Sequence, residues 1–157
     1  MAVNANSNSS RLWSFLKPIR EVATYLKTKV TGFYSINGHN VLEFPENNKK
    51  ENFVLFLEQI RNKNPHGRIV IILDNFRTHH AIMVREKAKE LNIILIHLPP
   101  YSPDLNPIEF VWKSVKRAVS NISPIKIEEL KNIILKSFHE LTSSLSFAKN
   151  WIKTYIN

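Results

Sequence analysis

Two carboxylates stand where a buried strand should end and where a helix should begin. Asp74 directly follows the apolar run Ile69-Val-Ile-Ile-Leu73, and thirty-four residues separate it from Glu109, which lies behind a proline-rich turn. Mg²⁺ prefers oxygen ligands and usually takes only one or two protein carboxylates besides substrate phosphates. Two such ions can activate a water and stabilise the leaving oxygen of a phosphoryl displacement. The pair therefore predicts a divalent-metal site.

Each of these acids also has a purely structural interpretation. Asp74 and the following Asn75 are common turn residues after a strand. Glu109 occupies the third helical position behind Asn106, where a glutamate can cap the helix, and it precedes Lys113 by the spacing of a helical ion pair. Asp104, a third acid in the same turn, fits a cap better than a ligand. The residues alone leave these alternatives open.

The chain is basic around this turn and as a whole. A formal net charge of +9 and a pI near 9.9 favour a polyanionic partner such as nucleic acid. Basic or ionisable side chains near the two acids are candidate DNA contacts: Lys113, Lys116, Arg117, His79 and His80. Adjacent histidines need not converge on one metal, and the chain has no Cys, so zinc is not expected.

The predicted elements bring both acids to one edge of a sheet. A strand over Arg68–Leu73, a helix from about Ala81 to Leu91 and a strand over Ile93–Ile96 form a βαβ unit with parallel strands. The first strand is apolar throughout, which predicts that both of its faces are covered. Ligands of such sheets gather at the carboxyl ends of the strands. Asn106-Pro107 is a good start for the helix that carries Glu109.

The remaining chain predicts one α/β domain. Two extended runs, Thr31–Ile36 and Asn40–Phe44, flank Asn37-Gly38, which is a strong hairpin signal. Residues 2–10 are polar and aperiodic, as in a loop or frayed terminus. We therefore expect residues 1–10 to lie outside a domain spanning 11–157, a small sheet flanked by helices with 121–157 as its carboxy-terminal helices.

Three helices complete that prediction. Asn48 and Glu51 have the spacing of a capping box at the start of the first helix. Apolar residues recur at helical spacing along that helix and predict one buried face: Phe53, Phe56, Leu57 and Ile60. Another helix should run from Ser123-Pro124 to about His139, and a short one should follow. No apolar run reaches the roughly 18 residues of a membrane span, so we expect a soluble, cytoplasmic protein.

These motifs resemble the insertion-sequence branch of the mariner-like transposases. The resemblance rests on Ile-Leu-Asp74-Asn75, on His79-His80, and above all on Leu98-Pro-Pro-Tyr-Ser-Pro-Asp-Leu-Asn-Pro-Ile-Glu109 with Trp112 and Lys116. It implies an RNase H-like mixed sheet and a DDE catalytic site that holds Mg²⁺ or Mn²⁺. It also implies cleavage at transposon ends and strand transfer into target DNA. Asp74 and Glu109 would be the second and third acids.

The chain departs from that family at its amino-terminal end. The family's first acid lies shortly before a segment similar to Arg11-Leu12-Trp13-Ser14, yet residues 1–20 contain no Asp or Glu, and Glu21 has no matching context. We therefore expect an incomplete, inactive catalytic domain with its first strand missing or truncated. The alternative is a non-catalytic fragment that binds double-stranded DNA, pairs with itself or associates with full-length transposase.

Overall fold

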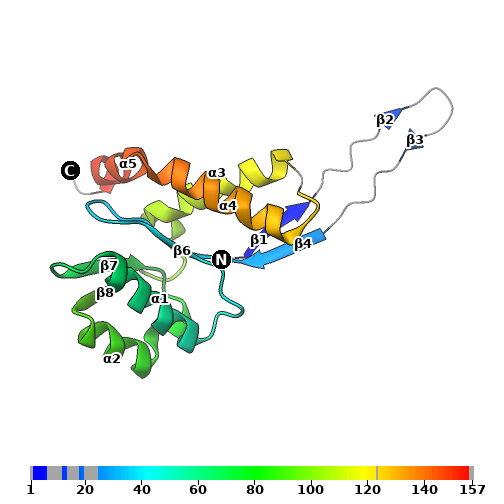
Figure 1. Cartoon of the computed structure of the whole chain (residues 1–157). Coiled ribbons are helices and arrows are strands. Elements are labelled where there is room, and N and C mark those ends of the chain that lie inside the picture. Colours follow the sequence, from blue (N-terminus) through cyan, green and yellow to red (C-terminus); the bar gives the residue numbers. More distant parts are fainter. Residues whose placement is uncertain (1, 7–11, 14–17, 20–24, 123, 156–157) are drawn as a thin grey trace.

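The computed structural model describes residues 2–6, 12–13, 18–19, 25–122 and 124–155 (Figure 1). The strands are β1 (Ala2–Asn6), β2 (Leu12–Trp13), β3 (Pro18–Ile19), β4 (Tyr25–Lys29), β5 (Thr31–Phe33), β6 (Val41–Glu43), β7 (Ile69–Leu73) and β8 (Ile93–His97). The helices are α1 (Lys50–Lys63), α2 (Ile82–Glu90), α3 (Pro107–Ile122), α4 (Ile127–Thr142) and α5 (Ser146–Tyr155), with short 3-10 turns η1 (Arg77–His80) and η2 (Pro103–Leu105).

The β5–β6 hairpin separates two hydrophobic cores. Its strands pair antiparallel, with Thr31 opposite Glu43, which confirms the predicted hairpin, although the connection between them is longer than Asn37-Gly38. Neighbouring side chains on a strand point to opposite faces, and the buried residues Val41 and Leu42 accordingly belong to different cores. Helices α1 and α2 lie on one side of the hairpin, and α3, α4 and α5 lie on the other (Figure 1).

The predicted βαβ unit is confirmed. Strands β7 and β8 are parallel, with Ile69 opposite Ile93 and Leu73 opposite His97, and α2 connects them. Asn92 closes the helix with a φ of 53°, a left-handed conformation that asparagine tolerates better than most residues. One expectation for this unit is wrong: β7 buries alternate residues only, so a single face is covered.

Helix α1 buries its predicted face, with Phe56, Leu57 and Ile60 in the core. The predicted Asn48 cap is wrong, because the residue before the helix is Lys49 and no side chain caps it. Asn47 takes that local role instead: its side-chain oxygen accepts a hydrogen bond from the Lys49 N–H at 3.0 Å. An asparagine one residue earlier can therefore order the entry to the helix.

The three carboxy-terminal helices form the second layer. Helix α3 begins at Pro107 as predicted and buries Val111, Trp112, Val115 and Val119. These pack against α4 through Leu130, Ile134 and Phe138, with the Trp112 and Phe138 rings stacked at 5.3 Å. Gly32 is required beneath them, because a Cβ there would lie 2.6 Å from the Trp112 ring. This contact joins α3 to β5.

The sheet is divided into strand pairs. Among the described residues, the pairs are β1–β4, β2–β3, β5–β6 and β7–β8, with no ladder joining one pair to another. Residues 2–6, expected to be loop, form β1, because β4 offers backbone partners from Tyr25 to Lys29 that outweigh their polar composition. Arg11, Ser14, Glu21, Ser123 and the expected domain boundary at residues 10 and 11 lie outside the described residues. No helix of the described chain is long and apolar enough to cross a membrane.

Candidate active site

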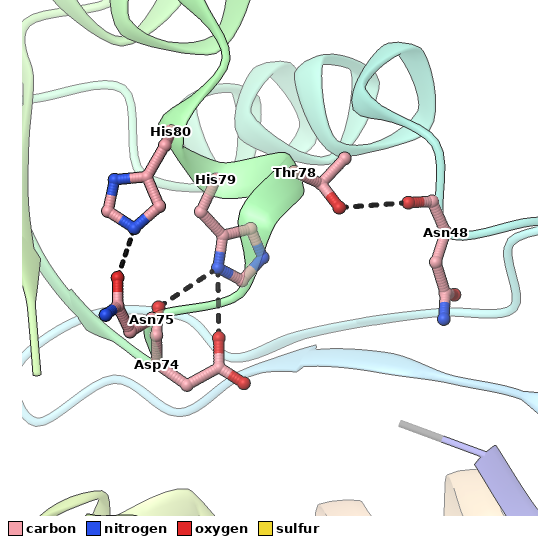
Figure 2. Close-up of polar contacts among 6 residues, drawn as sticks. All are labelled: Asn48, Asp74, Asn75, Thr78, His79 and His80. Carbon is pink, nitrogen blue, oxygen red and sulfur yellow. Dashed lines mark hydrogen bonds and ion pairs between the residues drawn. The ribbon is translucent and has the colours of Figure 1, made fainter. Parts of the chain in front are cut away.

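Asp74 leaves the carboxyl end of β7 and is held by the histidine that follows it. The Nδ1 atom of His79 lies 3.0 Å from the Asp74 Oδ1 atom and 3.3 Å from the Asp74 carbonyl oxygen (Figure 2). This hydrogen bond is the main reason why the pKa of Asp74 falls below its ordinary value. Asp74 is therefore an anion whose side chain is still 61% exposed.

His79 is positioned by α1 and by η1. Its side chain is only 16% exposed, and its ring packs 4.2 Å from the Phe53 ring of α1. The turn itself is tied to the loop before α1, since the Thr78 hydroxyl donates to the Asn48 carbonyl at 3.2 Å (Figure 2). The buried face of α1 thus fixes the histidine that orients Asp74. The sequence predicted His79 near the cleft but not this contact.

Glu109 stands in the first turn of α3, and the capping alternative does not account for it. A glutamate that caps this helix would accept a hydrogen bond from the Asn106 N–H. That N–H donates instead to the Pro103 carbonyl oxygen at 2.9 Å. Burial raises the pKa of Glu109, the charge of Lys116 opposes that rise, and the nearby charge of Asp74 adds to it. Among the described residues Glu109 forms no ion pair with Lys113. Its carboxylate remains available.

Asp74 and Glu109 both line one cavity of about 980 Å³. Burial is the main cause that raises the pKa of Glu109, and the negative charge of Asp74 adds to that rise. The pKa values of the two carboxyl groups shift in opposite directions. The hydrogen bond with His79 lowers the pKa of Asp74, whereas burial raises the pKa of Glu109. Opposed shifts of two neighbouring carboxyl groups are common at functional sites.

The histidines of this region diverge. The His80 Nε2 atom contacts the Asn75 side-chain oxygen (Figure 2), and the His80 ring stacks on His97 at 4.1 Å. His97, at the end of β8, has a buried Nδ1 atom without a hydrogen-bond partner in the described chain. Burial is also the main cause that lowers the pKa of His97. The stacking of His80 on His97 had no signal in the sequence.

The predicted basic residues of α3 do not line the cavity, although the charge of Lys116 acts on Glu109. Lys113, Lys116 and Arg117 are exposed on α3. His80 is also exposed, whereas His79 lines the cavity. Asp104 is exposed in η2 and does not line it either. The structure therefore brings together Asp74, Glu109 and His79, with the cations outside.

The carboxylate oxygens of Asp74 and Glu109 are of the ligand type that Mg²⁺ prefers. Two carboxylates facing one cavity can supply the one or two protein ligands that Mg²⁺ usually takes. Glu43 also lines the cavity, from the end of β6. Within the described ranges, however, no three His, Asp or Glu side chains form a group that could hold a metal ion. Asp74 and Glu109 are therefore candidate ligands without a third side chain grouped beside them in the described chain.

Known proteins resemble this chain in sequence and in fold. Residues 17–131 match the family model described as DDE superfamily endonuclease. Over 80 residues the chain is 31% identical to the Tc1 transposable element transposase of Caenorhabditis elegans, which covers 46% of this chain and 29% of that protein. The chain thus spans less than a third of this relative.

Solved structures of the Mos1 transposase have the same fold. The Mos1 strand transfer complex gives a TM-score of 0.60 at 19% identity, covering 90% of this chain and 51% of that one. The catalytic domain of the Mos1 mariner transposase gives 0.56 at 19% identity, covering 74% and 70%. Other Mos1 catalytic-domain structures contain Mg or Mn. These matches confirm the predicted RNase H-like α/β fold and the resemblance to mariner-like transposases.

The family match has a direct structural counterpart. The matched residues 17–131 include β7, the turn that leads to α3, and the Asp74 and Glu109 carboxylates that line the cavity. By this match and by its fold, the chain belongs to the DDE superfamily endonuclease family.

Proposed function

We propose that this chain is an incomplete transposase catalytic domain that binds Mg²⁺ or Mn²⁺ through Asp74 and Glu109. The observation that carries the proposal is the convergence of these two carboxylates on one cavity, with Asp74 held as an anion by His79. The Mos1 catalytic domains solved with Mg and with Mn support the choice of metal. Such a metal would polarise a phosphate and activate the attacking oxygen.

The chain's own residues would have three tasks in that chemistry. Asp74 and Glu109 would supply carboxylate oxygens to the metal. His79 would keep Asp74 ionised and fix its orientation through the bond to Oδ1. Lys113, Lys116 and Arg117, which are exposed, would attract the phosphates of double-stranded DNA by charge, and the exposed His80 would be a further contact to the DNA.

Metal titration tests this assignment. Mn²⁺ binding to the purified chain, followed by calorimetry or electron paramagnetic resonance, should weaken by ~10-fold or more in Asp74→Asn or Glu109→Gln, because each loses a charged ligand. Asp104→Asn is the matched control, since this acid of the same turn does not line the cavity. Equal affinity in all three variants would exclude the two-carboxylate site.

A non-catalytic role is the second candidate, and the exposed cations of α3 favour it. A fragment with this basic surface would bind transposon DNA, pair with itself or associate with full-length transposase, and so modulate transposition. DNA affinity should fall in Lys113→Glu and Lys116→Glu, and the salt dependence should become shallower, since each phosphate contact releases counterions. Lys89→Glu, at an exposed position of α2, controls for the change in net charge.

A further inference from the structure

The turn between β8 and α3 presents an aromatic ring to solvent. Tyr101 is fully exposed, whereas the next most exposed large apolar residue of the described chain, Ile125, is 72% exposed. Within the described chain no hydrogen bond or ring contact involves the Tyr101 side chain. Aromatic rings dominate the packing of cores and interfaces. Tyr101 packs in no core of this chain, so its ring is free to meet a ligand.

The backbone of Tyr101 is strained. Its φ is 58°, in the left-handed region, where a bulky residue other than glycine or asparagine is an outlier. Strain of this kind persists only where the surrounding structure fixes it, and it gathers at ligand sites. Pro100 precedes Tyr101 and Pro103 follows closely, and the ring of each proline fixes its own φ. Because the Tyr101 ring gains no packing within the described chain, the strain points to a contact outside it.

Both ends of this turn are fixed, and one of them lies at the candidate active site. The Leu98 N–H donates to the Leu73 carbonyl oxygen at 2.9 Å, directly before Asp74. Just before α3, the Leu105 carbonyl oxygen accepts a hydrogen bond from the Trp151 Nε1 atom of α5 at 2.9 Å. The turn is therefore attached to the strand that carries one acid and to the start of the helix that carries the other.

The other exposed aromatic residues also stand next to the two acids. Phe76 lies two residues after Asp74 and is 47% exposed, and Phe110 directly follows Glu109 and is 43% exposed. Where the structure describes side-chain exposure, no further aromatic residue is among the exposed large apolar ones. Exposed rings therefore gather along the chain around the candidate active site.

Positive charge accompanies these rings. Lys113, Lys116 and Arg117 are exposed on α3, the helix into which the turn leads, and the charge of Lys116 acts on Glu109. Surfaces that bind unpaired nucleic acid combine cations that follow the backbone with aromatic rings on which bases stack. An apolar protein partner would not require the cations. The combination favours DNA as the partner of the exposed ring.

We propose that Tyr101 stacks on an unpaired nucleobase of the DNA, next to the phosphate on which Asp74 and Glu109 act. Inside a paired duplex each base is covered by its neighbours, so a protein ring reaches its face only after the base leaves the stack. The proposal rests on the function proposed above, in which DNA is the substrate. It adds the state of that DNA, which has lost base pairing beside the scissile bond. Tyr101 positions the strand and takes no part in the chemical step.

Two DNA probes test this proposal on the complete chain. One is a short duplex that ends in an overhang of unpaired thymidines, and the other is the matched duplex with fully paired ends. Thymidine suffices because stacking on an aromatic ring tolerates any base. By fluorescence anisotropy, Tyr101→Asn should bind the overhang probe ~10-fold more weakly and the paired probe equally well. Tyr101→Phe should keep both affinities, because its ring remains.

Stability separates a contact with DNA from a structural role in the turn. Tyr101→Asn should keep or raise Tm, because the described ring packs on nothing and asparagine tolerates a positive φ. Ile125→Asn is the matched control, since it removes the next most exposed apolar side chain at a position that does not line the cavity. It should leave the affinity for both probes unchanged.

Photocrosslinking detects the contact in the unaltered chain. A 5-iodouracil base in the overhang should attach to Tyr101, and peptide mapping by mass spectrometry locates the bond. A crosslink that maps away from the turn would contradict the proposal, as would a lower Tm in Tyr101→Asn or an equal loss of affinity for both probes. Unchanged affinity for both probes, together with altered self-association of Tyr101→Asn, would show that the ring contacts protein instead.

Mn²⁺ titration keeps this proposal distinct from the metal site. If Mn²⁺ binds through Asp74 and Glu109 while Tyr101→Asn keeps its affinity for the overhang probe, only the stacking contact is refuted. If Mn²⁺ does not bind while Tyr101→Asn loses affinity for that probe alone, the metal site is refuted and the stacking contact stands.

Discussion

At the scale of single residues, the informative pair is Asp74 with His79. Asp-Asn after a strand is ordinary turn chemistry, and the sequence alone left that alternative open. The hydrogen bond from His79 fixes the orientation of the Asp74 carboxylate, and the packing of the His79 ring against Phe53 fixes His79 in turn. A turn aspartate would need no such support. This contact therefore favours the metal-ligand interpretation of Asp74.

Replacing His79 should remove the main cause that lowers the pKa of Asp74. In His79→Ala the pKa of Asp74 should rise toward its usual value, because the hydrogen bond that lowers it is gone. The stability that this bond gives is present above the unfolded pKa and is lost as the pH falls through the folded pKa. NMR titration of the Asp74 carboxyl carbon measures the shift.

His80→Ala is the control for that titration. His80 contacts Asn75 and His97 and makes no described bond to Asp74, so its removal should leave the pKa of Asp74 in place. A pKa that moves equally in both variants would mean that local packing, and not the His79 bond, sets the charge of Asp74.

Glu109 should cost stability when it is ionised. Because burial raises its folded pKa, the folded chain holds this proton more tightly than the unfolded chain does. Stability is therefore lost as the pH rises from the unfolded value through the folded one. Glu109→Gln should raise the free energy of unfolding near pH 7 by at most about 1 kcal/mol, and Tm by ~2–4 °C.

Thermal melts across pH check this prediction. The gain in Glu109→Gln should disappear below about pH 4, where the carboxyl group is protonated in both states. Glu86→Gln, at an exposed position of α2, should leave Tm nearly unchanged. A Glu109→Gln protein that is less stable than the original at neutral pH would contradict the expected sign.

At the scale of elements, Arg61 organises the ends of α1, α2 and β7. Its guanidinium donates to four backbone carbonyls, those of Asn64, Gly67, Leu91 and Asn92, at 2.8 to 3.1 Å. These acceptors lie where α1 and α2 end and just before β7 and β8 begin. One side chain thus fixes how the two strands enter the sheet and, through β7, where Asp74 stands.

Removing that side chain should destabilise the βαβ unit. Arg61→Ala leaves four carbonyl oxygens without their charged donor, and we expect a loss of about 2–3 kcal/mol in the free energy of unfolding. Arg61→Lys should recover only part of it, because an ammonium lacks the planar fork of donors. Urea denaturation measures both, with exposed Lys63→Ala as the control. A loss below about 0.5 kcal/mol would fall within ordinary surface effects and refute the role.

At the scale of the whole molecule, the acids that line the cavity should limit catalysis. Asp74, Glu109 and Glu43 line it, but the described residues form no group of three side chains that could hold a metal ion. A geometric error of about 1 Å at a catalytic centre can cost ~10²-fold in rate. We therefore expect negligible metal-dependent nicking of supercoiled DNA by this chain alone. Robust turnover that Asp74→Ala abolishes would show that the chain is a complete enzyme.

The elements and the two acids were largely predictable from local pattern. Helical spacing identified the buried faces of α1 and α3, and the apolar run before Asp74 identified β7. The Asn48 cap failed because neighbouring asparagines compete for the same local role, and composition does not decide between them.

The sequence by itself determined which residues could hold a metal, the strand and helix that carry them, and the family to which the motifs belong. Those properties depend on residue type and short spacing, which are local. Only the tertiary structure decided that His79 orients Asp74, that Glu109 is free of its capping partner, and that one face of β7 and β8 is uncovered. A strand apolar at every position has the same sequence whether one of its faces is covered or both are, so its neighbours in space make that choice.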